Sequence, residues 1–180
     1  QPGGVHTLTG LAHDKDSHVA SDAEINAQTL RYRSLKLAAF QKTLKAPPIF
    51  GDAKGDLLIL GWGSTKGAIE EAVEAARAEG KKVSSMHLPF LQPMPPGIKE
   101  AMSGFKQVMT IESNWSDSPQ EKIIDETNRR YSGMATLLRA RYLVDVDCWT
   151  EVSGQPIKPG SIRKVIGDNL EAALRRLTWT

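Results

Sequence analysis

The chain has little cysteine, no long apolar run and almost no excess charge. Cys148 is its single cysteine, which excludes an internal disulfide, a thiolate-rich zinc site and a four-cysteine iron–sulfur cluster built from this chain alone. The longest apolar runs, such as Leu57–Leu60, fall far short of the ~20 residues that a membrane span needs. The 23 basic and 21 acidic residues leave a formal net charge of +2 without a basic block. We therefore expect neither a membrane protein nor a nucleic-acid-binding one.

The length of 180 residues fits one ordinary domain with an additional arm. The sequence begins at Gln1 rather than methionine and shows no signal peptide, so we expect a cytoplasmic piece of a longer polypeptide. Residues 1–50 are predicted to be an inter-domain connector and a helical arm. The arm begins at a Ser21 or Asp22 cap and ends before Pro47-Pro48. Residues 51–180 are predicted to be one compact domain.

Apolar strands and amphipathic helices alternate along this second part. Strands are expected at 56–61, 82–88, 107–112 and 142–147, and helices at 64–78, 98–103, 116–130, 134–141 and 161–177. The first of these helices places four apolar residues on one face, Ile69, Ala72, Val73 and Ala76. The alternation predicts an α/β fold, a three-layer sandwich with a mainly parallel sheet that is preceded by an extended segment and the helical arm.

A glycine-rich turn, Gly61–Gly67, joins the first strand to the first helix of this domain. Helix N-termini at such turns bind phosphate, but the Lys-Ser/Thr pair of a P-loop is missing after the last glycine. The third glycine comes one residue late for a dinucleotide fingerprint, and the second strand ends at His87 without an acidic residue for a ribose. Two readings remain: a tight turn whose helix is capped by Ser64 or Thr65, or a contact with an anion or a partner.

Polar residues follow the carboxyl ends of the predicted strands, where α/β proteins bind ligands. The candidates for ligand or subunit contact are Gly63, Ser64, Thr65, His87, Glu112 and Asn114. Structural roles explain the same residues: a hydrogen bond from His87 to loop backbone, and capping of the next helix by the Glu112 segment.

Two further groups of residues carry no assigned chemistry. His6, His13 and His18, with Asp14 and Asp16 between them, match no tight metal-ligand spacing, and we predict no metal site. Four arginines lie either on a solvated helix face or on a surface that binds a partner, Arg129, Arg130, Arg139 and Arg141. No catalytic residue is predicted, because no nucleophile–base order or paired carboxylates stand out.

Several of these segments together resemble the alpha subunit of 2-oxoacid:ferredoxin oxidoreductases, most closely the 2-oxoglutarate type. The matching segments, in order, are Gly10–Asp14, Leu60–Thr65 with Gly67–Ile69, His87–Pro89, Leu91–Pro96, Glu112–Asn114 and Leu137–Val146. The resemblance covers nearly the whole chain. One departure is the segment 115–134, which is longer and more polar than in the family.

The resemblance implies a transketolase C-terminal-like domain at the end of the alpha subunit. In such enzymes thiamine diphosphate attacks the 2-oxo carbon, CO2 leaves, and electrons pass through a [4Fe–4S] cluster to ferredoxin while coenzyme A accepts the acyl group. The cluster and most diphosphate and Mg contacts belong to the beta subunit, so this chain alone is expected to be inactive and to pack against that partner. The alternative is a free-standing module that binds a small anion in a crevice of Gly63, Ser64, His87 and Glu112.

Overall fold

The computed structural model describes residues 2–5 and 9–177, with side chains up to residue 172. The chain divides into two compact units, Gln1–Leu44 with Gln92–Met94, and Lys45–Leu91 with Pro95–Thr180. None of the helices in the described residues has the length and apolar character needed to cross a lipid bilayer. We describe each unit by itself.

The first unit contains one long helix, α1, Ala23–Gln41. Asp22 is its cap, because the Asp22 carboxylate accepts hydrogen bonds from the backbone N–H of Glu24, at 2.8 Å, and of Ile25, at 3.1 Å. The predicted helical arm is therefore confirmed, with Asp22 rather than Ser21 as its cap. No residue of α1 is buried, and its apolar side chains, among them Leu30 and Leu35, are exposed.

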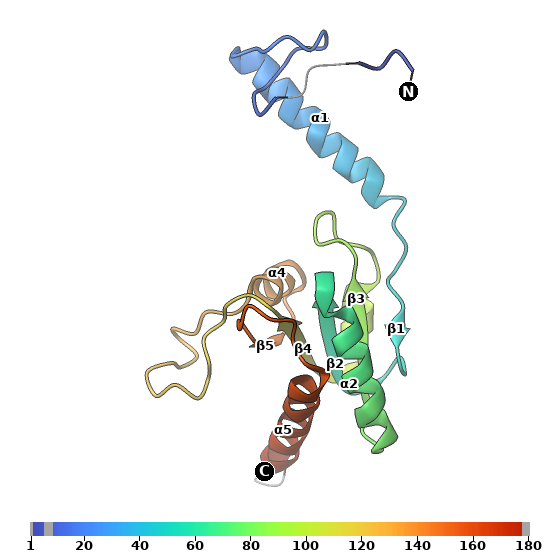
Figure 1. Ribbon diagram of the computed structural model, residues 1–180, viewed down its shortest axis with the longest axis vertical. Helices are drawn as coiled ribbons and strands as arrows, with labels where there is room; N and C mark the ends of the chain where they lie inside the picture. The colour runs from blue at the N-terminus through green and yellow to red at the C-terminus, as the bar shows by residue number, and fades with distance from the viewer. Residues whose placement is uncertain (1, 6–8, 178–180) are drawn as a thin grey trace. The chain divides into compact units, whose positions relative to one another are not determined.

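The second unit is built on a five-stranded sheet with the order β1-β3-β2-β4-β5 (Figure 1). Its strands are β1, Ile49–Phe50; β2, Gly55–Trp62; β3, Val83–Leu88; β4, Phe105–Glu112; and β5, Asp147–Thr150. Strands β2, β3, β4 and β5 run parallel, and β1 pairs antiparallel with β3 at one edge. The predicted mainly parallel α/β sheet is confirmed, and β1 is an addition that the sequence did not indicate.

Helices cover the sheet, as the alternating pattern predicts. On one face, α2, Lys66–Ala78, and α5, Pro159–Leu177, pack over an apolar cluster that includes Leu57, Ile59, Val83, Met109 and Ile111. The four apolar residues that we expected to point inward from α2 are all buried, Ile69, Ala72, Val73 and Ala76. The other helices, α3, Ile98–Met102, and α4, Gly133–Tyr142, contact β4. α4 begins beside Glu112, whose side chain alternates with that of Ile111 and so points to the opposite face.

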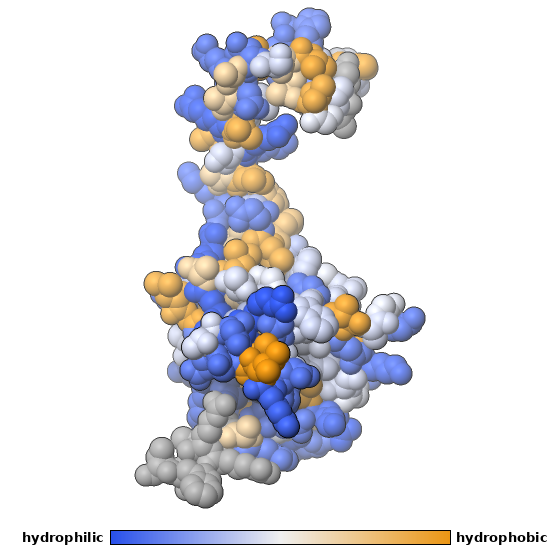
Figure 2. Space-filling view, turned by 90° about the vertical axis from the view of Figure 1, so that its left-hand side faces the viewer, coloured by the Kyte–Doolittle hydropathy of each residue, from blue (hydrophilic) through white to orange (hydrophobic). Residues whose placement is uncertain are grey.

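The helix predicted over residues 116–130 is wrong. These residues form a loop whose two ends meet: the Asp117 N–H donates to the Arg130 carbonyl, and the Asp117 carboxylate accepts from both the backbone N–H and the guanidinium of Arg130, all at 2.8–2.9 Å. A polar segment with Pro119 and few apolar residues has no face to bury, so local pairs replace the helix. In Figure 2 the face toward which this loop projects is mostly hydrophilic, with separate small apolar patches on it.

The strand predicted over residues 142–147 is also misplaced. α4 continues to Tyr142 and ends at Leu143, which takes a left-handed conformation with φ of 54°. Strand β5 therefore starts only at Asp147, where it pairs with Met109. The alternating pattern Leu143–Val146 reflects a helix end and a short connection instead of a strand.

The ion pair that closes the loop makes stability depend on pH. Hydrogen bonds from the Arg130 side chain, followed by that from its backbone, hold the pKa of Asp117 well below its ordinary value of 3.8. A carboxyl with a depressed pKa in the folded state stabilises above its unfolded-state pKa, and this contribution is lost as pH falls through the folded-state pKa. We expect Asp117→Asn to lower the urea midpoint at pH 7, and the deficit to shrink below about pH 4.

The matched control for this prediction is Asp168→Asn, on the exposed side of α5. Its urea midpoint should equal that of the parent chain at every pH. A deficit of Asp117→Asn that stayed constant from pH 7 to pH 3 would contradict the ion-pair explanation.

Candidate functional site

The glycine turn leaves β2 at Trp62, passes through a short 3-10 turn, Gly63–Thr65, and enters α2 at Lys66. The buried Thr65 hydroxyl donates to the Trp62 carbonyl at 2.9 Å and does not cap α2. The expected capping of this helix by Ser64 or Thr65 is therefore wrong. A Cβ at Gly61 would press on Cδ1 of Ile69 and lie 2.9 Å from Oγ1 of Thr65, so both side chains would have to shift.

Gly63 and Gly67 offer a matched test of this turn. Gly63 has a φ of 62° with open space around it, whereas Gly67 lies in the first turn of α2, also in open space. We expect Gly63→Ala to destabilise the chain by about 1 kcal/mol, because a left-handed conformation strains an L-residue. Gly67→Ala should stabilise it by about 0.5 kcal/mol, because alanine favours the helix. Urea denaturation of both variants measures the difference, and equal effects would rule out backbone strain at Gly63.

His87 lies on the α2 side of the sheet, in register with Gly61. Burial is the main reason that its pKa is lowered, the Lys66 ammonium lowers it further, and the Glu70 carboxylate opposes both. Its Nδ1 is buried without a hydrogen-bond partner, so the expected hydrogen bond to loop backbone does not form at that nitrogen. The hollow beside His87, lined by Gly61, Lys66, Ile69, Glu70, Ser85 and Met86, has no room for a water molecule. It cannot admit a ligand without rearrangement.

Glu112 is the centre of a buried polar network on the other face of the sheet. Its side chain is 1% exposed and accepts backbone hydrogen bonds from Met134, at 3.0 Å, and Ala135, at 3.2 Å. The hydroxyls of Thr110 and Ser132 also donate to this carboxylate, as does the side-chain amide of Asn114. Glu112 thus supplies the anionic cap of α4, where a negative charge also complements the helix dipole. The helix that this segment was expected to cap, at 116–130, does not form, and the Glu112 carboxylate caps α4 instead.

The six candidate residues do not form one crevice. Gly63, Ser64, Thr65 and His87 gather around the start of α2. Glu112 and Asn114 lie at the start of α4, and the Glu112 side chain points away from the face that carries His87. A small-anion site that combines Gly63, Ser64, His87 and Glu112 is therefore not supported by this geometry.

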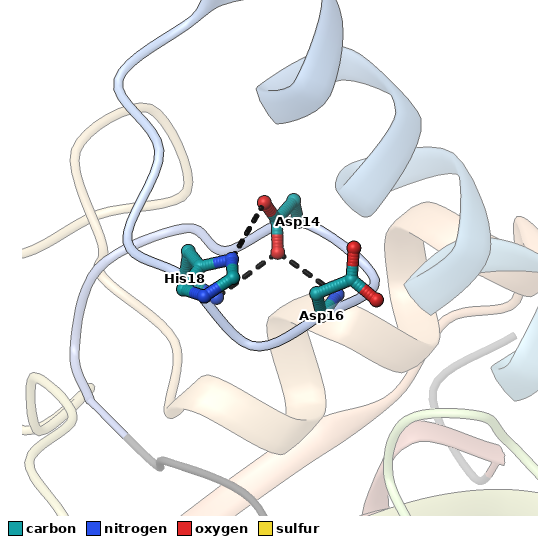
Figure 3. A group of neighbouring side chains, drawn as sticks. All are labelled: Asp14, Asp16 and His18. Atoms are coloured by element: carbon teal, nitrogen blue, oxygen red, sulfur yellow. Dashed lines mark hydrogen bonds and ion pairs between the residues drawn. The ribbon is translucent and has the colours of Figure 1, made fainter.

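Asp14, Asp16 and His18 come together in the first unit (Figure 3). One oxygen of Asp14 accepts the backbone N–H groups of Asp16 and His18, both at 2.9 Å, and the other lies 3.4 Å from Nδ1 of His18. The His18 N–H is the main reason that the pKa of Asp14 is lowered. The carboxylate therefore closes a turn between His13 and Val19, which form a β-bridge. His6, the remaining member of the group considered from the sequence, lies outside the described residues.

Three of the four arginines form ion pairs within the chain, which the sequence did not indicate. Arg129, whose side chain is 11% exposed, lies 2.8 Å from Asp147, and Arg139 pairs with Asp145. Both guanidinium groups stack on the Tyr131 ring, at 4.6 and 4.2 Å from its centroid. The expectation that these arginines lie on a solvated basic face or bind a partner is therefore wrong for Arg129 and Arg139. Arg130 forms an ion pair with Asp117. Arg129 and Asp147 are 18 residues apart and Arg130 and Asp117 are 13 apart, so no short motif could reveal these two pairs.

Comparison with known proteins gives a consistent result. Residues 55–155 match the family described as pyruvate:ferredoxin oxidoreductase core domain II. The 2-oxoglutarate oxidoreductase subunit KorA of Mycobacterium tuberculosis is 30% identical over 178 residues, which cover 98% of this chain and 24% of KorA. The 2-oxoacid:ferredoxin oxidoreductase subunit alpha of Saccharolobus solfataricus is 27% identical over 111 residues, 59% of this chain and 18% of that subunit.

A solved structure agrees with the sequence relatives. The 2-oxoglutarate:ferredoxin oxidoreductase from Magnetococcus marinus, with 2-oxoglutarate, coenzyme A and succinyl-CoA bound, superposes with a TM-score of 0.65 at 25% identity. The superposition covers 93% of this chain and 27% of that one. The chain thus spans about a quarter of the length of these relatives or less. These matches show that the chain belongs to the 2-oxoacid:ferredoxin oxidoreductase family, in which it corresponds to core domain II of the alpha-type subunit.

Proposed function

We propose that the chain is the C-terminal, transketolase C-terminal-like domain of the alpha subunit of a cytoplasmic, thiamine diphosphate-dependent 2-oxoacid:ferredoxin oxidoreductase. The enzyme would convert a 2-oxoacid such as 2-oxoglutarate to its acyl-CoA by oxidative decarboxylation, with ferredoxin as electron acceptor. The observation that supports the proposal is the alignment with KorA, which covers 98% of this chain and so extends over both of its units.

Within that enzyme the domain serves subunit packing rather than chemistry. The polar groups at the strand ends are used inside the fold: the Glu112 carboxylate caps α4, and the Thr65 hydroxyl is bound to the Trp62 carbonyl. His87 faces a hollow with no room for a ligand. A structural role accounts for Glu112 and Thr65, and His87 has no space beside it for a substrate.

The described residues do not fit the cofactors that the family uses. Cys148 is buried and is the chain's single cysteine, whereas a [4Fe–4S] cluster takes four. A cavity of about 590 Å³ is lined by Gln107 and Arg129, of which Oε1 and Nε respectively are buried without a hydrogen-bond partner. Asp125 and Glu126 also line it, and their negative charges would repel a diphosphate. We therefore assign thiamine diphosphate, Mg and the cluster to the rest of the complex, chiefly to the beta subunit.

Reconstitution tests this proposal. The full-length alpha subunit that contains this chain, co-purified with its beta subunit, is expected to reduce ferredoxin when 2-oxoglutarate and coenzyme A are both present. The 180-residue chain alone should show no turnover and no binding of thiamine diphosphate in calorimetry. Turnover or tight cofactor binding by the chain alone would contradict the packing role. Failure of the complex to oxidise any 2-oxoacid would contradict the proposed reaction.

A further inference from the structure

The His87 side chain lies in a tightly packed joint between β3 and the start of α2. The hollow beside it is lined from β2, β3 and α2, by Gly61, Lys66, Ile69, Glu70, Ser85 and Met86. We call these residues and His87 the β3–α2 joint. The hollow has no room for a water molecule, and Nδ1 of His87 is buried without a hydrogen-bond partner. The joint therefore contains a titratable nitrogen that lacks both a protein partner and contact with solvent.

The unpartnered nitrogen determines which form of the His87 ring the joint can hold. A neutral imidazole has one nitrogen that donates a hydrogen bond and one that accepts. A buried N–H without an acceptor is rarer in proteins than a buried acceptor without a donor, so we expect the neutral ring to carry its proton on Nε2. A second proton would then have to bind Nδ1, where it would create a buried charged donor with no acceptor. The packed joint thus requires a neutral His87.

The charged groups around the joint do not compensate a proton on His87. Lys66 and Glu70, both on α2, are the charged residues that line the hollow; β2 and β3 contribute none, and β1, which pairs with β3, consists of Ile49 and Phe50. Lys66 Nζ already lies 3.7 Å from Oε1 of Glu70. Burial is the main reason that the pKa of His87 is lowered, and the Lys66 ammonium lowers it further against the opposing effect of the Glu70 carboxylate. The surroundings therefore favour the neutral ring.

We propose that the β3–α2 joint is a pH-sensitive switch. With a neutral His87, the first turns of α2 stay packed on the sheet. When the ring turns outward, Nδ1 takes a proton from the solvent, the charged ring does not return to the joint, and these turns stay open. Gly63 and Gly67 have open space around them and can follow the movement, whereas Val73 and Ala76 are buried in the core and hold the rest of α2 in place. The inference is independent of the proposed function.

The direction and size of the pH effect follow from the two states of the ring. In the open state the ring is solvated and has the ordinary histidine pKa of about 6.5, whereas in the closed state its pKa is lower. The closed state is therefore fully stable above about pH 6.5 and loses stability as the pH falls from there toward the closed-state pKa, below which no more is lost. At about pH 5.5 the open ring is about tenfold more often charged than neutral, so opening can increase at most about tenfold over that at neutral pH.

Hydrogen exchange measured by mass spectrometry tests the switch in the full-length protein that contains this chain. The opening equilibrium of the backbone amides at 69–71, corrected for the intrinsic pH dependence of exchange, is expected to rise several-fold, up to about tenfold, between about pH 7.5 and pH 5.5. The amides at 137–139 in α4 should not change. The profile of His87→Phe, which has no titratable ring, should be flat. A parent profile as flat as that of His87→Phe would overturn the proposal.

Two variants of α2 keep the test decisive even if His87→Phe does not fold. Lys66→Gln removes the cation that lowers the pKa of His87, so it should weaken the pH dependence of opening, whereas Glu70→Gln removes the opposing carboxylate and should strengthen it. Changes in the same direction would contradict the switch.

A control and a spectroscopic measurement complete the test. His18→Gln changes a histidine whose side chain is 78% exposed, so it should reproduce the parent profile. Nitrogen-15 NMR of the imidazole rings should show a neutral His87 with its proton on Nε2 at about pH 7.5. A neutral ring with its proton on Nδ1 would overturn the proposal, because the joint would then already hold a buried donor.

Discussion

Replacing Glu112 by alanine is expected to lower the free energy of unfolding by about 3 kcal/mol or more, because several buried donors lose their acceptor together. The Met134 and Ala135 N–H groups at the start of α4 and the buried Ser132 hydroxyl all point at this carboxylate. Urea denaturation followed by circular dichroism measures the loss.

Two further variants show whether the carboxylate itself is responsible. Glu112→Gln keeps the size of the side chain but puts an amide donor in place of one acceptor oxygen, so it should lose most of the same stability. Glu71→Ala, on the exposed face of α2, should change stability by less than about 0.5 kcal/mol. A Glu112→Ala variant as stable as Glu71→Ala would mean that the network does not hold α4.

Leu138→Ala should destabilise the chain by about 3 kcal/mol. Leu138 is 0% exposed on α4, and its truncation leaves a cavity in the core in addition to the lost burial. Leu143→Ala, just after the same helix, removes the same atoms from an 89% exposed position and should be nearly neutral. Equal effects at the two positions would contradict the packing of α4 against the sheet.

The losses of stability caused by Glu112→Ala and Leu138→Ala should not be additive. Glu112 holds the start of α4 and Leu138 packs its middle, so once either is lost the helix gains less from the other. We expect the double variant Glu112→Ala, Leu138→Ala to fall short of the sum of the single losses. Strict additivity in urea denaturation would show that the two residues stabilise independent parts of the domain.

Periodicity in the sequence predicted the parts of the fold in which one face is buried. The helical spacing of Ile69, Ala72, Val73 and Ala76 predicts a helix at 64–78; the structure has it at Lys66–Ala78, with all four side chains buried. The strands β2, β3 and β4 were recognised as short apolar runs between turns. In each case the local spacing of apolar residues indicates which side chains are buried.

The rest depends on pairs that are distant in sequence. The loop at 116–130 is held by contacts between Asp117 and Arg130, and Glu112 caps a helix that begins 21 residues later, at Gly133. No local pattern reveals such pairs, so the sequence predicts a helix over residues 116–130 and offers the Glu112 carboxylate as a candidate for ligand binding. The alternation of apolar and polar residues at Leu143–Val146 predicts a strand there. In the structure these residues form a helix end and a short connection, so the alternation arises by chance.

The clamp between Asp117 and Arg130 also defines where the chain tolerates change. Because the two ends of the loop are joined at its base, the residues between them can differ in number without moving β4 or α4. Glu121-Lys122 is thus a suitable point for inserting an epitope or a fluorescent protein, so that the protein could be followed in living cells with its sheet undisturbed.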